Sequence, residues 1–271
     1  MFEQNWVKKY GSWAVITGAS DGIGKETAIL LAEIGINLVL VARRRPMLEA
    51  LSDHLTTHFN IQCQVVALDL SSQDAIETLI TETQDLDIGL LVAAAGYGTS
   101  GSFIDLPIER ETNMLDVNCR AVLTLSHHFG KRFAKQGRGG IVLFSSLVAF
   151  QGVPLSANYA ATKAYIQSLV EGLHQELSPL GVDVLASAPG PIHSGFAVRA
   201  NMQMGMALKA DVVARETLRA LGHKTTVQPG LLSKVMIGSL SFLPRPLRVR
   251  VMGQIMGSMT INQPVSMIDI S

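Results

Sequence analysis

Short runs of apolar residues, many of them β-branched, alternate with helix-like segments from Trp13 to Pro189. The runs are almost uninterrupted by polar residues, which is typical of strands that are buried on both faces of a sheet. The segments between them carry apolar residues at helical spacing, for instance over 23–34 and 158–177. This alternation predicts βαβ units around a parallel sheet. The six expected strands are Trp13–Thr17, Asn37–Ala42, Gln64–Leu68, Ile88–Ala93, Gly140–Ser145 and Val182–Ser187.

The composition favours a folded α/β protein and argues against a nucleic-acid binder. Of the 271 residues, 48% are hydrophobic and 16% are charged, so apolar surface is ample for one large domain or two small ones. The 22 basic residues balance the 22 acidic ones. A chain without net charge has no long-range field to attract a polyanion such as DNA.

The sequence predicts a cytoplasmic protein and leaves membrane association open. The N-terminal residues MFEQNWVKKYGSW lack the apolar run of a secretory signal, and no stretch approaches the roughly 18 uninterrupted apolar residues that span a bilayer. Cys63 and Cys119 have no His or Cys at ligand spacing, so neither a disulfide framework nor a metal site is expected. These features fit a reducing compartment.

A glycine-rich turn follows the first expected strand and leads into a helix. In the segment TGASDGIG, Gly18 and Gly22 can adopt positive φ, and Gly24 allows the helix to pack closely on the strand. The free N–H groups at the start of the helix can bind a pyrophosphate. The G-x-x-x-G-x-G spacing therefore predicts a dinucleotide site, against the alternative of a tight turn with incidental glycines.

The second expected strand ends in three consecutive arginines, where an acidic residue would bind the ribose of NAD. Arg43 can instead pair with a 2′-phosphate, helped by Arg44 and by the Ser20 hydroxyl, so NADP is favoured over NAD. The alternative is a solvated basic start of a helix. Asp69, after the third strand, can accept a hydrogen bond from the adenine amino group or cap a helix that starts near Ser71.

A tyrosine and a lysine at helical spacing form the candidate catalytic group. Tyr159 and Lys163 are four residues apart, so they project from one face of a helix. The Lys163 ammonium can stabilise a tyrosinate and lower the phenol pKa, and the hydroxyl of Ser146, at a strand end, can hold a substrate carbonyl. Tyr-x-x-x-Lys alone is a weak motif, but together with the glycine-rich turn and with Ser146 it is specific.

Together these motifs resemble the short-chain dehydrogenase/reductase family over about 13–194. The resemblance implies a single-domain Rossmann fold, a doubly wound parallel β-sheet with helices on both faces, and a nicotinamide cofactor. It implies that Tyr159 is the general acid/base, that Ser146 orients the carbonyl, and that Lys163 binds the nicotinamide ribose and lowers the Tyr159 pKa. It also implies that Asn118 holds a water in the proton relay.

The same resemblance implies the residues of the cofactor site. The segment PGPIHS at 189–194 resembles the family's nicotinamide loop, with Ser194 in place of the usual Thr. The cofactor-binding residues would be Gly18, Ser20, Asp21, Gly22, Ile23, Gly24, Arg43, Arg44, Asp69, Leu70, Ala95, Gly96, Tyr159, Lys163, Pro189, Gly190, Ile192 and Ser194.

Two further features depart from the family's pattern. The segment AAAG at 93–96 stands where the family usually has Asn-Asn-Ala-Gly, so a side chain that ties neighbouring strands together is lost. Because that role is structural and Gly96 is retained, we expect an intact cofactor site. Asp21 stands where many NADP-dependent members have a basic residue, and its carboxylate is expected near the phosphates.

The chain after residue 190 differs in composition from the rest. Thr217–Ile268 contains six basic residues, no acidic residue and five of the eleven methionines. Within a single domain over 1–271, we expect residues 195–222 to form a substrate lid and residues 230–271 to form an apolar, basic C-terminal extension. This composition suits contact of the extension with anionic lipid, with another subunit or with its own domain.

Three methionines, Met202, Met204 and Met206, alternate in the expected lid. Their thioethers favour an adaptable apolar substrate pocket, and the alternative is that they are ordinary loop residues.

The sequence therefore predicts an oxidoreductase that transfers a hydride between NADP(H) and a ketone or secondary alcohol. The expected substrate is apolar, either lipid-like or steroid-like. The alternative from another class is an NADP-binding redox sensor or scaffold without turnover. All four catalytic positions are filled, which favours the enzyme. We also expect a homodimer or homotetramer and no nucleic-acid partner.

Overall fold

The computed structural model describes residues 6–203 and 207–260. Its strands are β1 (Trp13–Thr17), β2 (Asn37–Ala42), β3 (Cys63–Ala67), β4 (Ile88–Ala93), β5 (Gly139–Phe144), β6 (Val182–Ser187), β7 (Ile192–His193), β8 (Leu208–Lys209) and β9 (Thr226–Val227). Its helices are α1 (Trp6–Tyr10), α2 (Gly22–Ala32), α3 (Arg45–Phe59), α4 (Gln73–Glu82), α5 (Ile108–Leu115), α6 (Ala121–Gln136), α7 (Ala157–Leu177), α8 (Phe196–Arg199), α9 (Ala210–Ala220), α10 (Leu231–Ser241) and α11 (Arg245–Met259).

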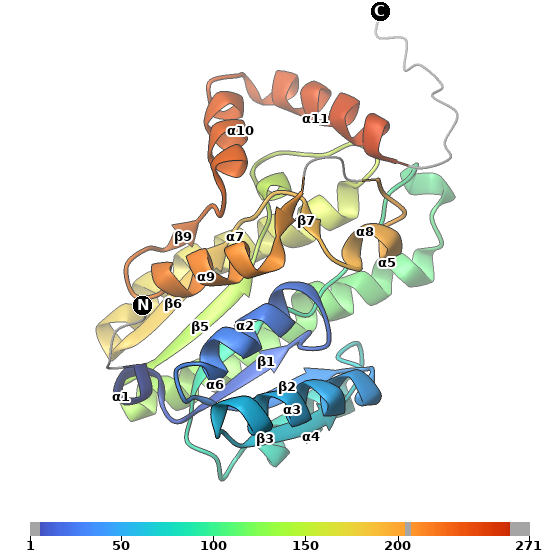
Figure 1. Ribbon diagram of the computed structural model, residues 1–271. Helices are drawn as coiled ribbons and strands as arrows, with labels where there is room; N and C mark the ends of the chain where they lie inside the picture. Colours follow the sequence, from blue (N-terminus) through green and yellow to red (C-terminus); the bar gives the residue numbers. More distant parts are fainter. Residues whose placement is uncertain (1–5, 204–206, 261–271) are drawn as a thin grey trace, which may run out of the picture.

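Seven parallel strands form one sheet in the order β3-β2-β1-β4-β5-β6-β9 (Figure 1). The predicted parallel sheet is confirmed, and β1, β2, β4 and β6 have the predicted bounds. The other two predicted strands, β3 and β5, each lie one residue earlier than expected, because pairing with β2 and β6 sets their ends: Cys63 pairs with Leu38, and Gly139 with Val182. The two-residue strand β9 was not predicted, since it is too short to show a pattern.

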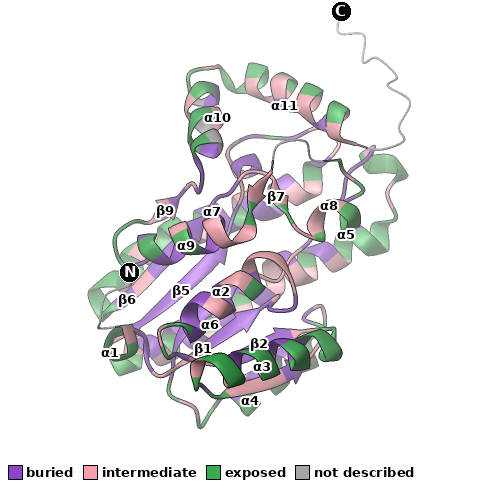
Figure 2. Ribbon diagram, viewed as in Figure 1, coloured by how far each residue is buried: buried purple, intermediate pink, exposed green. Residues whose placement is uncertain are grey.

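Helices cover both faces of the sheet, as expected for a Rossmann fold. One core layer lies between the sheet and α2, α3 and α9, and the other lies between the sheet and α4, α6 and α7. Along β1, Ala14 and Ile16 belong to the first layer and Val15 belongs to the second, and all three are fully buried (Figure 2). Burial on both sides explains why the strand sequences are continuous apolar runs.

The strand order reverses between β1 and β4, since β1 pairs with β2 on one side and with β4 on the other. In open parallel sheets, ligands bind outside the carboxyl ends of the strands at such a reversal. The glycine-rich turn follows β1, and the segment 93–96 follows β4, so both lie at this point. A Cβ added to Gly18 would come within 2.8 Å of the Ala95 nitrogen, which shows how closely the two segments approach.

The C-terminal helices α10 and α11 stand over the carboxyl ends of the strands (Figure 1). Leu240, Met252 and Met256 from these helices are buried in a third apolar cluster together with Leu147 and Ala160. Part of the expected extension therefore packs on its own domain; residues 261–271 lie outside the described residues. Within the expected lid region, α9 packs against α2 as part of the core.

Candidate active site

The glycine-rich turn has the conformation that the sequence predicts. Gly18 and Gly22 have φ of 70° and 55°, a region that favours glycine. A Cβ on Gly24 would collide with the carbonyl group of Gly18, so only glycine lets α2 begin this close to β1. The turn therefore presents the N-terminus of α2 to the crevice at the strand ends, where its free N–H groups can bind an anion.

Asp21 caps α2 and also binds the start of the segment that was expected to form a lid. One carboxylate oxygen accepts a hydrogen bond from the Gly22 nitrogen at 2.7 Å, and the other accepts one from the Gly195 nitrogen at 3.1 Å. The Ser194 hydroxyl accepts a hydrogen bond from the nitrogen of Phe196, the first residue of α8, at 3.3 Å. Asp21 thus joins the glycine-rich turn to Gly195, a role that sequence reasoning missed because the two segments are far apart in the chain.

The two predicted phosphate-binding arginines lie together after β2. Arg44 donates a hydrogen bond to the Ser20 hydroxyl at 3.0 Å, and Arg43 lies 3.7 Å from the Asp69 carboxylate. Both partners of the Arg43–Asp69 pair are about half exposed, so this ion pair is weak and leaves the guanidinium available to another anion.

Asp69 does not cap a helix that starts near Ser71. It accepts a hydrogen bond from the Ser71 nitrogen at 3.0 Å, but α4 begins at Gln73 and its N-cap position is Ser72. Partial burial would raise the pKa of Asp69, but the hydrogen bonds from Ser71 and the charge of Arg43 outweigh it, so the pKa is lowered and the group stays a carboxylate. A carboxylate facing the crevice can accept a hydrogen bond from an adenine amino group.

The candidate catalytic residues converge at the carboxyl end of β5. Tyr159 and Lys163 lie one turn apart on α7, with the Lys163 Nζ 5.6 Å from the centroid of the Tyr159 ring. The Tyr159 ring packs on Phe196 of α8 at a centroid distance of 5.4 Å, and the Lys163 ammonium donates to the Phe144 carbonyl at 2.8 Å. Ser146, two residues after β5, lines the same cavity as Tyr159 and lies close enough to lower the pKa of its phenol.

Burial dominates the protonation of this group. It raises the pKa of the Tyr159 phenol, and the nearby Ser146 side chain lowers it to a smaller extent. Burial therefore outweighs the other influences on the Tyr159 pKa in the protein alone, and the role of Lys163 in lowering it stays a prediction. Burial also lowers the pKa of Lys163 to about 8, with a small opposing contribution from Cys119. Because its pKa is raised, the Tyr159 phenol keeps its proton at neutral pH and can donate it.

Asn118 lies in a π-helical turn, Asp116–Arg120, between α5 and α6. Its side-chain amide donates to the Tyr97 carbonyl at 2.8 Å and to the Thr162 hydroxyl at 3.1 Å, and its oxygen accepts from the Tyr97 nitrogen at 3.1 Å. These bonds tie the loop after β4 to α7, beside the catalytic lysine. The role in a proton relay stays a prediction.

The segment after β4 lacks the family's usual asparagine, but the Thr17 hydroxyl still ties it to β1. Thr17, the last residue of β1, accepts a hydrogen bond from the Ala95 nitrogen at 3.0 Å and so joins the ends of the two neighbouring strands. A Cβ on Gly96 would lie 3.0 Å from the Asn118 side-chain oxygen, so the segment also packs tightly on its other side. The crevice between β1 and β4 is therefore held in place without the usual asparagine.

One cavity of about 300 Å³ brings nearly all the predicted residues together. Every predicted cofactor-binding residue lines it, and so do Ser146, Tyr159 and Lys163. Asn118 does not line it, although its neighbour Val117 does. Sequence reasoning missed the residues that form the end of the cavity beneath α10 and α11, namely Leu147, Val148, Met236, Met252, Ile255, Met256 and Met259. It also missed Phe196, which packs on Tyr159, and Arg199, which lies near Arg43, Arg44 and Asp21.

This apolar end of the cavity is rich in methionine. Met202 lines it, which supports an adaptable pocket; Met204 and Met206 lie outside the described residues. On α11, the lining residues fall at helical spacing over 252–259, so one face of the helix lines the cavity. That spacing is a signal in the sequence that could have identified this wall.

The comparisons with known proteins agree with the fold and the site. Residues 12–205 match the short chain dehydrogenase family. A 7β-hydroxysteroid dehydrogenase of Collinsella aerofaciens is 31% identical over 243 residues, which is 85% of this chain and 90% of that protein. A solved structure from work on 7β-hydroxysteroid dehydrogenase stereoselectivity superposes with a TM-score of 0.85 at 29% identity, covering 91% of this chain and 98% of the other.

A second solved structure carries a bound nucleotide. It is a short-chain dehydrogenase from Sphingobium yanoikuyae in complex with NADPH, with a TM-score of 0.77 at 28% identity, covering 86% of this chain and 96% of that one. The protein described here belongs to the short-chain dehydrogenase/reductase family. It is an NAD(P)-dependent oxidoreductase of the class that interconverts alcohols and carbonyl compounds.

Proposed function

We propose that the protein uses NADPH to reduce a bulky, apolar ketone to a secondary alcohol, or catalyses the reverse reaction. One observation carries this proposal: Ser146, Tyr159 and Lys163 share a single cavity with the glycine-rich turn and Arg43 at one end and an apolar, methionine-rich wall at the other. A polar end, a proton donor and an apolar end in that order match a nucleotide, a reacting carbonyl and an apolar substrate body.

The residues present fit a dinucleotide. Gly22 has positive φ, and Gly24 lets α2 begin close against β1, so the N-terminus of α2 lies at the cavity, where the pyrophosphate would bind. Arg43 and Arg44 would bind the 2′-phosphate, and the Pro189–Gly190 turn would hold the nicotinamide. Bound NADPH would supply the hydride.

Three side chains around the substrate carbonyl would then have separate roles in proton transfer. Ser146 would donate a hydrogen bond to the substrate carbonyl oxygen and hold it beside the phenol. Tyr159 would give its proton to that oxygen as the carbonyl carbon is reduced, and the alcohol would leave. The Lys163 ammonium would stabilise the resulting tyrosinate until a proton returns from solvent.

The apolar end of the cavity supports a large, rigid substrate. Thioethers are flexible and polarizable, so a wall with Met236, Met252 and Met256 can fit an irregular apolar body. The relatives named above act on a hydroxysteroid, as their names state, and a fused ring system is a substrate of this kind. We therefore propose a steroid-like or lipid-like ketone.

A screen of ketones tests the proposed function. The loss of NADPH absorbance would be followed with a 7-oxosteroid, a long-chain 3-oxoacyl thioester and cyclohexanone. Turnover of the bulky ketones in preference to cyclohexanone is expected. If NADPH binds but is not consumed with any ketone, and NADP is not reduced by the corresponding alcohols, the protein is a nucleotide-binding sensor or scaffold instead.

The pH profile should report on Lys163. Because burial lowers the pKa of Lys163 to about 8, the ammonium is present below that pH and is lost as the pH rises through it. We expect kcat/KM for ketone reduction, at saturating NADPH, to be constant below about pH 7 and to fall about tenfold per unit above about pH 8. A flat profile to pH 10, with circular dichroism unchanged, would contradict this role of Lys163.

Contact of the C-terminal helices with a membrane stays a prediction. No helix within residues 6–203 and 207–260 is long and apolar enough to cross a bilayer. Leu231, Val235 and Phe242 on and beside α10 are nevertheless 76%, 57% and 89% exposed, and the exposed Arg245 lies close by in sequence. Such a surface suits attachment to anionic lipid.

Vesicle co-sedimentation tests that contact. The protein is expected to bind anionic vesicles at low salt and to release as salt rises, because the attraction of about 1 kcal/mol per arginine is screened. A variant with Arg245, Arg248 and Arg250 changed to Gln should bind much less. If neither protein sediments with anionic vesicles at low salt, this surface serves another purpose.

A further inference from the structure

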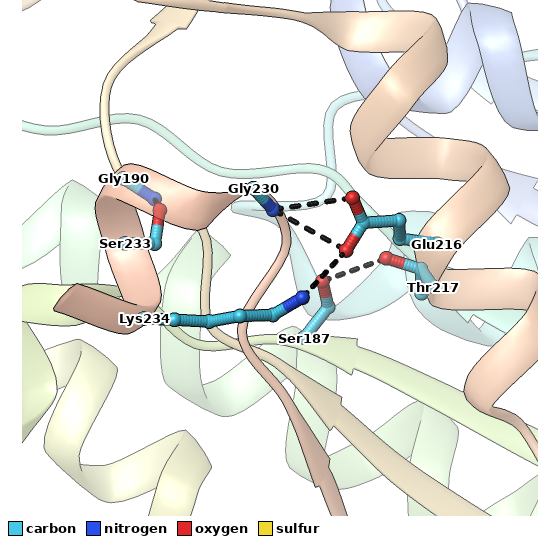
Figure 3. Close-up of polar contacts among 7 residues, drawn as sticks. All are labelled: Ser187, Gly190, Glu216, Thr217, Gly230, Ser233 and Lys234. Carbon is cyan, nitrogen blue, oxygen red and sulfur yellow. Dashed lines mark hydrogen bonds and ion pairs between the residues drawn. The ribbon is translucent and has the colours of Figure 1, made fainter. Parts of the chain in front are cut away.

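The first turn of α10 lies against the turn that follows β6. Ser233 is 2% exposed, and its hydroxyl accepts a hydrogen bond from the Gly190 nitrogen at 3.0 Å (Figure 3). A Cβ on Gly190 would lie 2.9 Å from that hydroxyl and 3.1 Å from the Leu147 side chain, so the contact is close on both sides. The Ser233 side chain and the backbone of Gly190 therefore form a buried, specific contact.

The carbonyl end of the same peptide unit is held by the loop that follows β5 and carries Ser146. Gly190 shares its peptide bond with Pro189, whose carbonyl oxygen accepts a hydrogen bond from the Leu147 nitrogen at 3.0 Å. The Ser146 hydroxyl lies 3.5 Å from that carbonyl oxygen. Since Ser233 binds the N–H and the loop after β5 binds the C=O, the orientation of this peptide plane is set from both sides.

The first turn of α10 is itself anchored by α9. Glu216 accepts hydrogen bonds from the Gly230 nitrogen, with both carboxylate oxygens at 3.3 Å, and its Oε2 lies 3.5 Å from the Lys234 ammonium (Figure 3). The next residue, Thr217, shares a buried hydrogen bond of 2.7 Å with Ser187 at the end of β6. Neighbouring residues of α9 thus hold both α10 and β6, on either side of the Pro189–Gly190 turn.

The same helix reaches the apolar end of the cavity. Met236 is three residues after Ser233, which places the two on one side of α10, and Met236 lines the cavity. A single helix therefore contacts both the nicotinamide loop and the wall that would surround the substrate.

We propose that Ser233 is a positioning residue that orients the Pro189–Gly190 peptide and, through it, the nicotinamide end of the site. This inference rests on the proposed function, since it assumes that NADPH binds with its nicotinamide at this turn. Without the Ser233 hydroxyl, the Gly190 N–H has lost its acceptor, and the peptide plane can rotate away from the loop that carries Ser146. The adenosine end, with Arg43, lies at the other end of the cavity and is not affected.

The experiment compares two ligands that differ in the nicotinamide half. NADPH and 2′,5′-ADP, which has no nicotinamide, would be titrated into the wild-type protein and into Ser233→Ala by calorimetry. We expect the Kd of Ser233→Ala for NADPH to rise about 3- to 10-fold, as for loss of one neutral hydrogen bond, and its Kd for 2′,5′-ADP to stay within about twofold. With NADPH saturating, kcat should fall while KM for the ketone changes little.

Two further variants control for packing. Ser233→Thr keeps the hydroxyl and should restore NADPH affinity to near the wild-type value. Ser239→Ala removes an exposed hydroxyl from the same helix, which donates a hydrogen bond to the Met236 carbonyl, and should leave the affinities for both ligands unchanged.

The outcomes separate this inference from the proposed function. If the wild-type protein binds no NADPH, the proposed function fails. If the wild-type protein binds NADPH and Ser233→Ala matches it in Kd and kcat, only the role of Ser233 is refuted. Equal losses of affinity for NADPH and for 2′,5′-ADP in Ser233→Ala would also refute it, because they would show a general loss of structure.

Discussion

Tyr159→Phe is expected to lower kcat for ketone reduction by about 100-fold or more while NADPH affinity stays within about threefold. The substitution removes only the phenolic oxygen, which is the proposed proton donor. The ring that packs on Phe196 remains, so the wall of the cavity should keep its shape. Steady-state kinetics and an NADPH titration on the same preparation measure the two quantities.

Tyr165→Phe is the matched control, because Tyr165 lies on the same helix and is 38% exposed. It should retain wild-type kcat. Turnover of Tyr159→Phe at more than a tenth of the wild-type rate would show that another group donates the proton. Ser146, whose hydroxyl lines the same cavity as Tyr159, would then be the first alternative to test.

Arg43→Ala is expected to weaken NADPH binding about 10- to 150-fold, with little change for NADH. The loss corresponds to about 1.5 to 3 kcal/mol for a charge-assisted hydrogen bond to the 2′-phosphate. The charge of Asp69 adds to the effect: its lowered pKa keeps it ionised, and without Arg43 it would repel a phosphate. Titrations with both nucleotides measure the ratio.

Arg45→Ala controls for a general change in surface charge. Arg45 lies 3.7 Å from Glu49 in an exposed ion pair like that of Arg43, but it does not line the cavity. It should leave the affinity for both nucleotides within about twofold. Equal losses of affinity for NADPH and for NADH in Arg43→Ala would mean that the arginine supports the fold of the site and does not bind the 2′-phosphate.

Features that depend on neighbours in the chain were predictable in detail. The strand β1, the turn with positive φ at Gly18 and Gly22, and the one-turn spacing of Tyr159 and Lys163 all follow from local sequence. The NADP preference inferred from Arg43 is local in the same way and stays a prediction. Local signals were less reliable at boundaries, since pairing with adjacent strands moved β3 and β5 by one residue.

The protonation of the site required the three-dimensional structure. A tyrosine beside a lysine suggested a lowered phenol pKa, but burial raises the pKa of Tyr159 in the folded protein. The two side chains lie one turn apart, yet the Lys163 ammonium also donates to the Phe144 carbonyl. Solvent exclusion depends on everything packed around a group, so it cannot be derived from spacing along one helix.

By itself, the sequence determined the α/β class, the glycine-rich turn and the catalytic spacing, because each depends on periodicity or on residues within a few positions. Only the tertiary structure decided which residues close the cavity. Met236 and Met252 line the same cavity as Tyr159 because α10 and α11 fold back over the strand ends, and Asp21 reaches Gly195 across 174 positions of the chain. Such contacts depend on how helices pack together, and packing is decided by the whole chain rather than by a local pattern.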